Sequence, residues 1–243
     1  MLKGRLFSIL FLGFLVSATS AMADFQGQLE LLPAGCESTG QCTLGADFGF
    51  IGADGYGWQA SKGLITDGAS IPPWAKKIVG QPFEKAFVRA AVIHDHYCNR
   101  KVRPWRQTHK VFYEGLLSAG VSKSKAGIMY FAVLVGGPKW VKLIKGKPCP
   151  VGMGCINSFQ IGSSVSDGAF GVDESGVLLM TREQSFGSAQ FENTLEEKTP
   201  ELEALGDNLS AETVEKMANE SMKGDFYFQN GDEVGTNLGL TVQ

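Results

Sequence analysis

Three consecutive segments with helical periodicity, each bounded by proline or glycine, are the feature that most restricts how this chain can fold. The segment 105–119 shows it best, because its apolar and aromatic stripe is spaced 4, 3, 4 and 3 residues apart: Trp105, His109, Phe112, Leu116 and Ala119. Pro104 precedes the segment and Gly120 follows it, which predicts a helix between them. A helix with one apolar face has to bury that face against another element.

The segments on either side of it are also predicted to be helices. After Pro82, residues 83–99 carry a second stripe: Phe87, Ala91, His94 and Cys98. A third helix is expected from Ser122, a favourable N-cap residue, to Val135, where Gly136-Gly137-Pro138 ends it. These three segments predict a three-helix core.

The remaining segments predict strands and a separate C-terminal region. Residues 25–32 alternate as a strand does, and residues 56–66 resemble a glycine-punctuated β-ribbon. Beyond Pro150, residues 156–186 resemble short strands, and residues 192–222 form an acidic, weakly helical stretch. We therefore expect an α+β fold: a small β-ribbon followed by a three-helix core, residues 24–155, and a mixed acidic C-terminal region, residues 156–243.

The first 23 residues are typical of a signal peptide. Lys3 and Arg5 precede an apolar stretch, residues 6–16, and Ala21-Met22-Ala23 has the small-x-small pattern of a cleavage site. The apolar stretch is short for a membrane span, which argues against an uncleaved anchor. The sequence predicts cleavage before Asp24 and a periplasmic or secreted protein.

Cysteine spacing agrees with export. Cys36 and Cys42, and likewise Cys149 and Cys155, are separated by five residues in glycine-rich surroundings. We expect two short-loop disulfides formed in an oxidising compartment, which leaves Cys98 over. Zinc binding by either pair is the alternative, but zinc motifs have tighter spacings and no histidine lies near these cysteines.

Charge divides the chain. Residues 24–172 carry a net charge of +6, and 11 basic residues lie between Arg100 and Lys147, whereas residues 173–243 carry −11. The basic segment is either a solvated face or a surface for an anionic partner, such as a membrane or a cell-wall polymer. Nucleic acid is not expected as a partner, because no basic motif with interleaved aromatic residues is present. The acidic region either folds over the basic face or keeps the protein soluble.

The candidate chemistry lies in the first half of the chain. The only three histidines, His94, His96 and His109, fall within sixteen residues. Two antiparallel helices packed 8–10 Å apart would bring His94 and His109 within hydrogen-bonding reach. Each histidine taken alone is more simply a core residue, but the adjacent Asp95 on an apolar helix favours a polar site.

A turn upstream supplies another carboxylate. Asp67-Gly68, within Thr66–Pro73, closes a predicted strand and leads towards the helix that carries His94 and Asp95. Such a turn often means only that the aspartate caps backbone groups. A carboxylate there can equally join a second carboxylate and backbone carbonyls around a hard cation.

These motifs resemble a known family. The strings Lys62–Pro72 (KGLITDGASIP) and Arg89–Asp95 (RAAVIHD), followed by Val111-Phe112-Tyr113 and Ala119-Gly120-Val121, resemble the domain of unknown function 1353 family, which phages and bacteria carry. The resemblance covers roughly residues 25–140 and implies no particular activity.

The same residues bear a more distant resemblance to bacterial secreted phospholipases A2: Asp67-Gly68-x-Ser70, then His94-Asp95, Tyr97 and Asn99-Arg100. The resemblance implies that His94 is the base and that Asp95 and Asp67 hold Ca²⁺. His109 stands where that family has an orienting aspartate, and the family's cysteine framework is missing. A transition-metal site for Zn²⁺, formed by His94 and His109 with Asp95 or Asp67, is the alternative.

Two hypotheses about function follow. The first is an exported metal-assisted hydrolase, with His94 and His109 catalytic, Asp67 and Asp95 binding the metal, and a phospholipid ester as the favoured substrate. The second is a non-catalytic exported binding module, or an assembly module derived from a phage.

Overall fold

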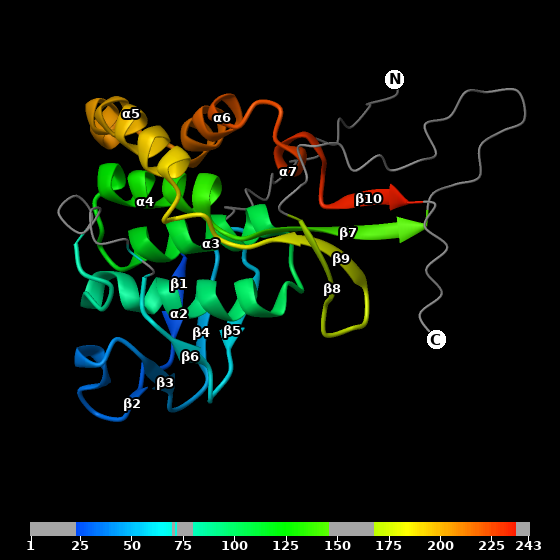
Figure 1. The fold of residues 1–243 in the computed structure, drawn as a ribbon. Helices are drawn as coiled ribbons and strands as arrows, with labels where there is room; N and C mark the ends of the chain where they lie inside the picture. Colours follow the sequence, from blue (N-terminus) through cyan, green and yellow to red (C-terminus); the bar gives the residue numbers. More distant parts are fainter. Residues whose placement is uncertain (1–22, 70, 72–79, 146–167, 237–243) are drawn as a thin grey trace, which may run out of the picture.

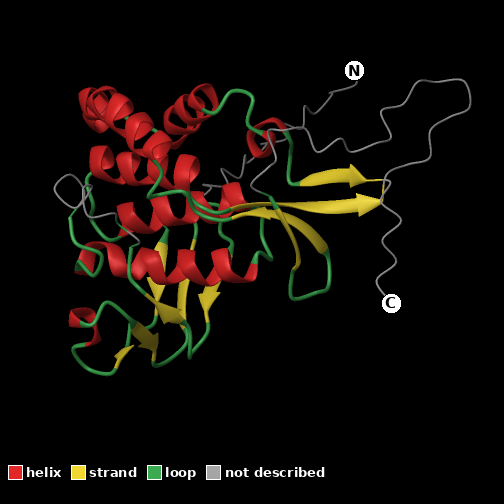
Figure 2. Ribbon diagram, in the orientation of Figure 1, coloured by secondary structure: helices red, strands yellow, loops and turns green. Residues whose placement is uncertain are grey.

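A computed structural model describes residues 23–69, 71, 80–145 and 168–236. The fold is mixed α+β, as expected: two small antiparallel sheets, a stack of helices and a third, extended sheet (Figures 1 and 2). The predicted signal peptide, apart from Ala23, lies outside the described residues, as do Cys149 and Cys155. Within the described ranges no helix has the length and apolar character needed to cross a membrane.

The two small sheets occupy the N-terminal part of the chain. One has the strand order β1-β4-β5 and consists of β1 (Asp24–Gln26), β4 (Phe48–Ile51) and β5 (Gly57–Ala60). The other has the order β2-β3-β6 and consists of β2 (Leu31–Leu32), β3 (Cys42–Leu44) and β6 (Ile65–Thr66), with a short 3-10 helix, η1 (Cys36–Ser38), between β2 and β3.

Both strand predictions in this part need correction. The expected strand 25–32 is divided between the two sheets, because the chain turns at Gly27, whose φ of 84° is left-handed. The expected ribbon 56–66 also divides: β5 pairs with β4, and β6 pairs with β3. Local alternation indicated extended structure but could not identify the partner of each strand.

The three predicted helices are present and stacked in sequence order (Figure 1). They are α2 (Lys85–Arg100), α3 (Trp105–Ser118) and α4 (Lys123–Gly136). Ser122 caps α4 as expected, since its hydroxyl accepts a hydrogen bond from the Lys125 amide. The two stripes are buried where α2 meets α3, except for the partly exposed Ala119.

The C-terminal region extends this core. The strands β7 (Lys139–Lys145), β8 (Ala169–Val172), β9 (Leu178–Arg182) and β10 (Glu233–Thr236) form a sheet of order β10-β7-β9-β8. The helices α5 (Ala189–Leu205) and α6 (Ala211–Ser221) pack on α4, and η3 (Gly206–Asn208) and α7 (Phe226–Gln229) complete the region. Described residues on both sides of residue 155 therefore share one sheet and one core. The predicted domain boundary near residue 155 lies outside the described residues. The division into domains stays a prediction.

The acidic region lies against part of the basic segment. Arg100 at the end of α2 pairs with Glu174 in the β8–β9 turn, and Lys110 lies 3.7 Å from Glu215 of α6. Lys123 donates a hydrogen bond to the Asp207 carbonyl. Several charges of the basic segment are thus occupied within the molecule.

Candidate functional site

A cavity of about 450 Å³ opens beside α2. Much of its polar wall comes from α2 and the turn after β6, with Asp67, His94, Asp95, Cys98 and Asn99, and other segments add Gln41, Lys101, Glu183 and Gln184. Its apolar wall comes from the other helices and the loop before α5: Phe112, Met129, Ala132, Val133, Phe186, Phe191 and Leu195. The volume lies within the range of small-molecule sites, roughly 300–1,000 Å³.

His94 and His109 meet at the back of this wall. Nε2 of His94 lies 2.8 Å from Nδ1 of His109, because the two apolar stripes place these residues on the facing sides of α2 and α3. His94 lines the cavity, whereas His109 lies behind it and is fully buried. The ring of Phe112 lies 4.9 Å from the His94 ring and covers its face.

The backbone determines which ring nitrogens carry protons. Nε2 of His109 lies 3.1 Å from the Pro138 carbonyl, which can only accept, so this nitrogen carries a hydrogen. Burial, and then the positive charge of His94 and Lys139, hold the pKa of His109 well below its ordinary value, so the ring is neutral. Nδ1 of His109 therefore accepts the hydrogen bond that Nε2 of His94 donates.

Gly137 permits this contact with the backbone. A Cβ atom at Gly137 would lie 2.4 Å from the Val133 carbonyl oxygen and 3.0 Å from Nε2 of His109. Any side chain there would displace the histidine or the end of α4. Gly137, which follows the end of α4, thus also determines the position of His109.

On its other side, His94 faces Asp95. Nδ1 of His94 lies 3.8 Å from Oδ1 of Asp95, while Oδ2 accepts a 2.6 Å hydrogen bond from the Thr66 hydroxyl. The same hydroxyl accepts a hydrogen bond from the Gly68 amide. This chain of contacts joins the turn of residues 66–68 to the helical His94-Asp95 pair, so the two motifs form one site.

Gly68 is required by the shape of that turn. Its φ is 78°, and a Cβ atom there would lie 2.6 Å from the Pro82 carbonyl oxygen. The turn keeps Asp67 at the cavity wall, which Asp67, His94 and Asp95 all line, whereas His109 lies behind it. Their catalytic and ligand roles stay predictions.

Cys98 is the site residue that sequence reasoning left unassigned. It lies one helical turn after His94, and its Sγ lies 3.4 Å from Nε2 of His94. The signal was present in the sequence, since residues four apart lie on the same face of a helix.

The charges of this cluster are coupled. Burial lowers the pKa of His94, but the interactions with Cys98 and with the Asp95 carboxylate outweigh it and raise the pKa to about 10. The surroundings of His94 therefore favour its protonated, imidazolium form.

Three of these side chains form a set of metal-binding donors. Nε2 of His94, Sγ of Cys98 and Nδ1 of His109 lie within 4.8 Å of one another. A tetrahedral zinc ion holds two ring nitrogens about 3.3 Å apart. These two nitrogens, now 2.8 Å apart, would have to separate by about 0.5 Å to admit the ion. Among the described residues the other group with metal-binding atoms is Cys36, Glu37 and Cys42, but its two sulfurs are joined.

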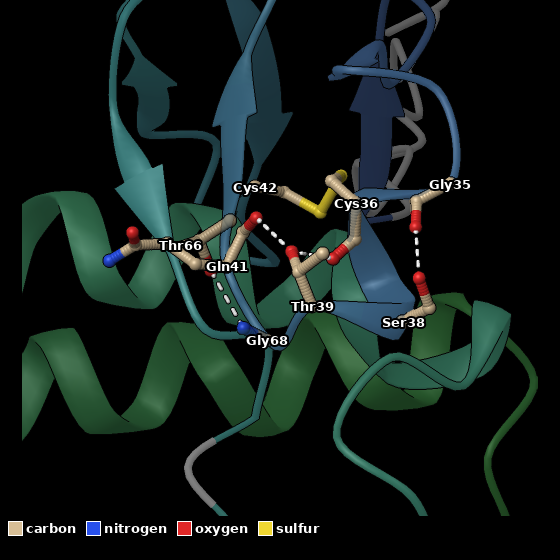
Figure 3. The surroundings of a disulfide bond; sticks show 8 residues. All are labelled: Gly35, Cys36, Ser38, Thr39, Gln41, Cys42, Thr66 and Gly68. Carbon is tan, nitrogen blue, oxygen red and sulfur yellow. Dashed lines mark hydrogen bonds between the residues drawn. A yellow bond between two sulfur atoms is a disulfide. The ribbon is translucent and has the colours of Figure 1, made fainter.

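The Cys36–Cys42 disulfide is present, as predicted (Figure 3). It closes the loop that contains η1, where the Thr39 hydroxyl donates to the Cys36 carbonyl. Cys42 is the register partner of Thr66 in the β3–β6 pair. The disulfide therefore braces the strand beside Thr66, whose hydroxyl contacts Asp95.

Comparison with known proteins gives a family match over this site. Residues 42–133, which contain Asp67, His94, Asp95, Cys98 and His109, match the family described as "Protein of unknown function (DUF1353)". This supports the expected family resemblance. No solved structure matches the chain.

Two curated relatives come from Sinorhizobium fredii (strain NBRC 101917 / NGR234). "Uncharacterized protein y4iH" is 50% identical over 113 residues, which is 46% of this chain and 47% of the relative. "Uncharacterized protein y4jT" is 38% identical over 160 residues, 62% of this chain and 47% of the relative. The chain thus spans about half the length of the curated relatives it matches. None of these comparisons supports the phospholipase A2 resemblance.

Proposed function

We propose that this protein is a metal-assisted hydrolase of acyl esters that uses a zinc-class ion. The observation that carries the proposal is the donor set of His94, Cys98 and His109 beside a cavity that Asp67 and Asp95 also line. Three protein ligands with one position left open are the usual arrangement of a catalytic zinc site.

The surroundings of the two histidines support a metal site. A histidine that binds a metal through one ring nitrogen usually donates a hydrogen bond from the other to a carbonyl or a carboxylate. His109 has the Pro138 carbonyl in that position, 3.1 Å away, and the Asp95 carboxylate lies 3.8 Å from Nδ1 of His94, at ion-pair distance. Ion binding requires that neither Nε2 of His94 nor Sγ of Cys98 carries a proton, because ligand atoms bind a metal in their deprotonated form.

The donor chemistry favours Zn²⁺ over Ca²⁺. Calcium takes six to eight oxygen ligands, whereas nitrogen and thiolate donors suit zinc. Of the two carboxylates expected to bind calcium, Asp95 already accepts a hydrogen bond from Thr66 through Oδ2. We therefore assign Asp95 to orienting His94.

An ion held by His94, Cys98 and His109 would supply a Lewis acid, which would acidify water and polarise an ester carbonyl. Asp67, on the cavity wall, accepts a proton from the attacking water. The water oxygen bonds to the acyl carbon, and the bond to the leaving oxygen breaks. Asp67 then returns the proton to that oxygen, which releases an alcohol and a carboxylic acid.

Substitution of Co²⁺ for zinc tests the site directly. We expect one ion per chain and a thiolate-to-cobalt absorption band, with ester hydrolysis lost on chelation and restored by Zn²⁺. Cys98→Ala should abolish the band, and His109→Gln should weaken ion binding at least tenfold.

His96→Gln is the matched control. His96 lies on the same helix but contacts Arg100 instead of the cluster, so ion binding should not change. A protein that binds neither ion stoichiometrically, or a cobalt complex without the thiolate band, would refute the proposal.

A second candidate is a non-catalytic binding module, and one observation favours it. Without any ion, the His94–His109–Pro138 chain already satisfies its ring nitrogens, as a structural polar network would. On this reading His94→Ala unfolds the protein and no ion binds. If the proposed function is correct, the variant stays folded and loses hydrolysis.

We also propose export, with an anionic membrane or cell-wall surface as a partner. The Cys36–Cys42 disulfide supports an oxidising compartment. The charges available for such a surface are fewer than the sequence suggests, because Arg100, Lys110 and Lys123 contact the C-terminal region.

A further inference from the structure

One wall of the cavity is supplied by the C-terminal region, outside the segment that matches the family. Phe186 comes from the loop between β9 and α5, and Phe191 and Leu195 come from the first turns of α5. Asp67, His94, Asp95 and Cys98, by contrast, lie within residues 42–133, although the C-terminal region also contributes the polar residues Glu183 and Gln184. The C-terminal region therefore helps to shape a site whose proposed chemistry lies in the family segment.

This wall is anchored to α4. The Ser185 amide donates a 2.7 Å hydrogen bond to the Gly136 carbonyl, and the rings of Phe186 and Phe191 meet edge to face at 5.4 Å. A Cβ atom at Gly136 would lie 2.5 Å from the Phe191 ring, so the aromatic ring packs directly on the helix backbone. Phe191 and Leu195 are both 3% exposed. The apolar wall is thus preformed.

The cavity is also amphiphilic, and several helices of the stack line it. Its lining residues come from α2, α3, α4 and α5, which pack on one another in that order, so it extends across the helix stack. Asp67, Asp95, His94 and Cys98 lie at the α2 side, and the contributions of α4 and α5 are aliphatic or aromatic, while Glu183 and Gln184 line the cavity from the loop before α5. A ligand with a polar head and an unbranched apolar tail matches this distribution.

We infer that the cavity binds an unbranched aliphatic acyl chain, with its carboxyl end at His94 and Cys98 and its tail along α4 and the Phe186–Leu195 wall. The cleavage of an ester of that acid rests on the proposed function, but binding of the chain does not. The C-terminal region then determines which chain length fits.

The inference predicts a chain-length series. Each methylene group buried in the apolar wall should raise affinity about fourfold. Titration calorimetry with saturated fatty acids from butyrate to palmitate should show this rise and then a plateau, once the tail reaches the end of the cavity. The wild-type protein alone suffices for this test. If it binds no fatty acid, or binds all of them with the same affinity, the inference is wrong.

Ala132→Leu tests the position of the tail. Ala132 lines the cavity from α4, and a leucine there fills space that the tail needs. We expect at least a tenfold loss for the longest acid that binds and little change for butyrate. Ala86→Leu is the matched control, because Ala86 is also a partly buried helical alanine but does not line the cavity. An equal loss at every chain length, or the same effect in Ala86→Leu, would overturn the placement.

Cys98→Ala separates this inference from the proposed function. The variant should keep the chain-length dependence of binding while losing the ion. A wild-type protein that binds fatty acids in this series but hydrolyses none of their p-nitrophenyl esters refutes the proposed function alone. Ion-dependent hydrolysis without any chain-length dependence refutes the present inference alone.

Discussion

Thr66→Val should destabilise the protein far more than its small change in shape suggests. The Thr66 side chain is 2% exposed, and its hydroxyl both donates to Oδ2 of Asp95, at 2.6 Å, and accepts from the Gly68 amide, at 3.0 Å. Valine has nearly the same shape but offers neither interaction. The substitution therefore breaks the connection between the turn of Asp67 and the helix of His94.

The magnitude follows from these two contacts. A hydrogen bond to a charged group contributes about 1.5–3 kcal/mol, and a buried amide left without a partner costs about 1–3 kcal/mol. We expect Thr66→Val to lower the free energy of unfolding by about 3–4 kcal/mol. Thr66→Ser keeps the hydroxyl and loses one methyl group, so its cost should be about 0.8 kcal/mol.

Urea denaturation followed by tryptophan fluorescence measures both variants against the wild type. The midpoint should fall strongly for Thr66→Val and only slightly for Thr66→Ser. A Thr66→Val protein within about 1 kcal/mol of the wild type would show that the Thr66–Asp95 contact does not hold the site together.

Substitutions at three further positions have defined outcomes. Phe112→Ala should lower the free energy of unfolding by about 3–5 kcal/mol, because Phe112 is 3% exposed between α2 and α3. A loss below about 1 kcal/mol in denaturant melts would show that this stripe contributes little to stability. Asp225→Asn should keep the cap of α7 but break the partly buried pair with Arg182, so urea melts should show a loss of about 1–3 kcal/mol. Asp225→Ala should lose about 1 kcal/mol more with the cap, and equal stability of Asp225→Asn and the wild type would contradict this. Burial holds the pKa of Lys139 well below its ordinary value. There is therefore a pH range in which Lys139 is protonated in the unfolded chain but not in the folded protein. Stability of the wild type relative to Lys139→Met should therefore rise as pH increases towards about 10.4, and parallel pH profiles from urea melts would refute the assignment.

Local sequence determined the helices and the pairing of their faces. The stripes of α2 and α3, with Pro104, Gly120 and the Ser122 cap, specify where each helix lies and which side is buried, since these signals act within a few residues. Because His94 and His109 lie on those stripes, their approach could be predicted as well. The short spacing of Cys36 and Cys42 likewise sufficed for the disulfide.

Tertiary packing decided the rest of the site. The hydrogen bond that fixes the His109 tautomer comes from Pro138, the position of Asp95 depends on Thr66, and the apolar wall comes from Phe186 and α5. Each of these contacts joins segments distant in sequence, and no local periodicity records which of them meet. Strand pairing shows the same limit, because alternation along residues 25–32 and 56–66 indicates an extended chain while the partner of each strand depends on how the whole chain folds.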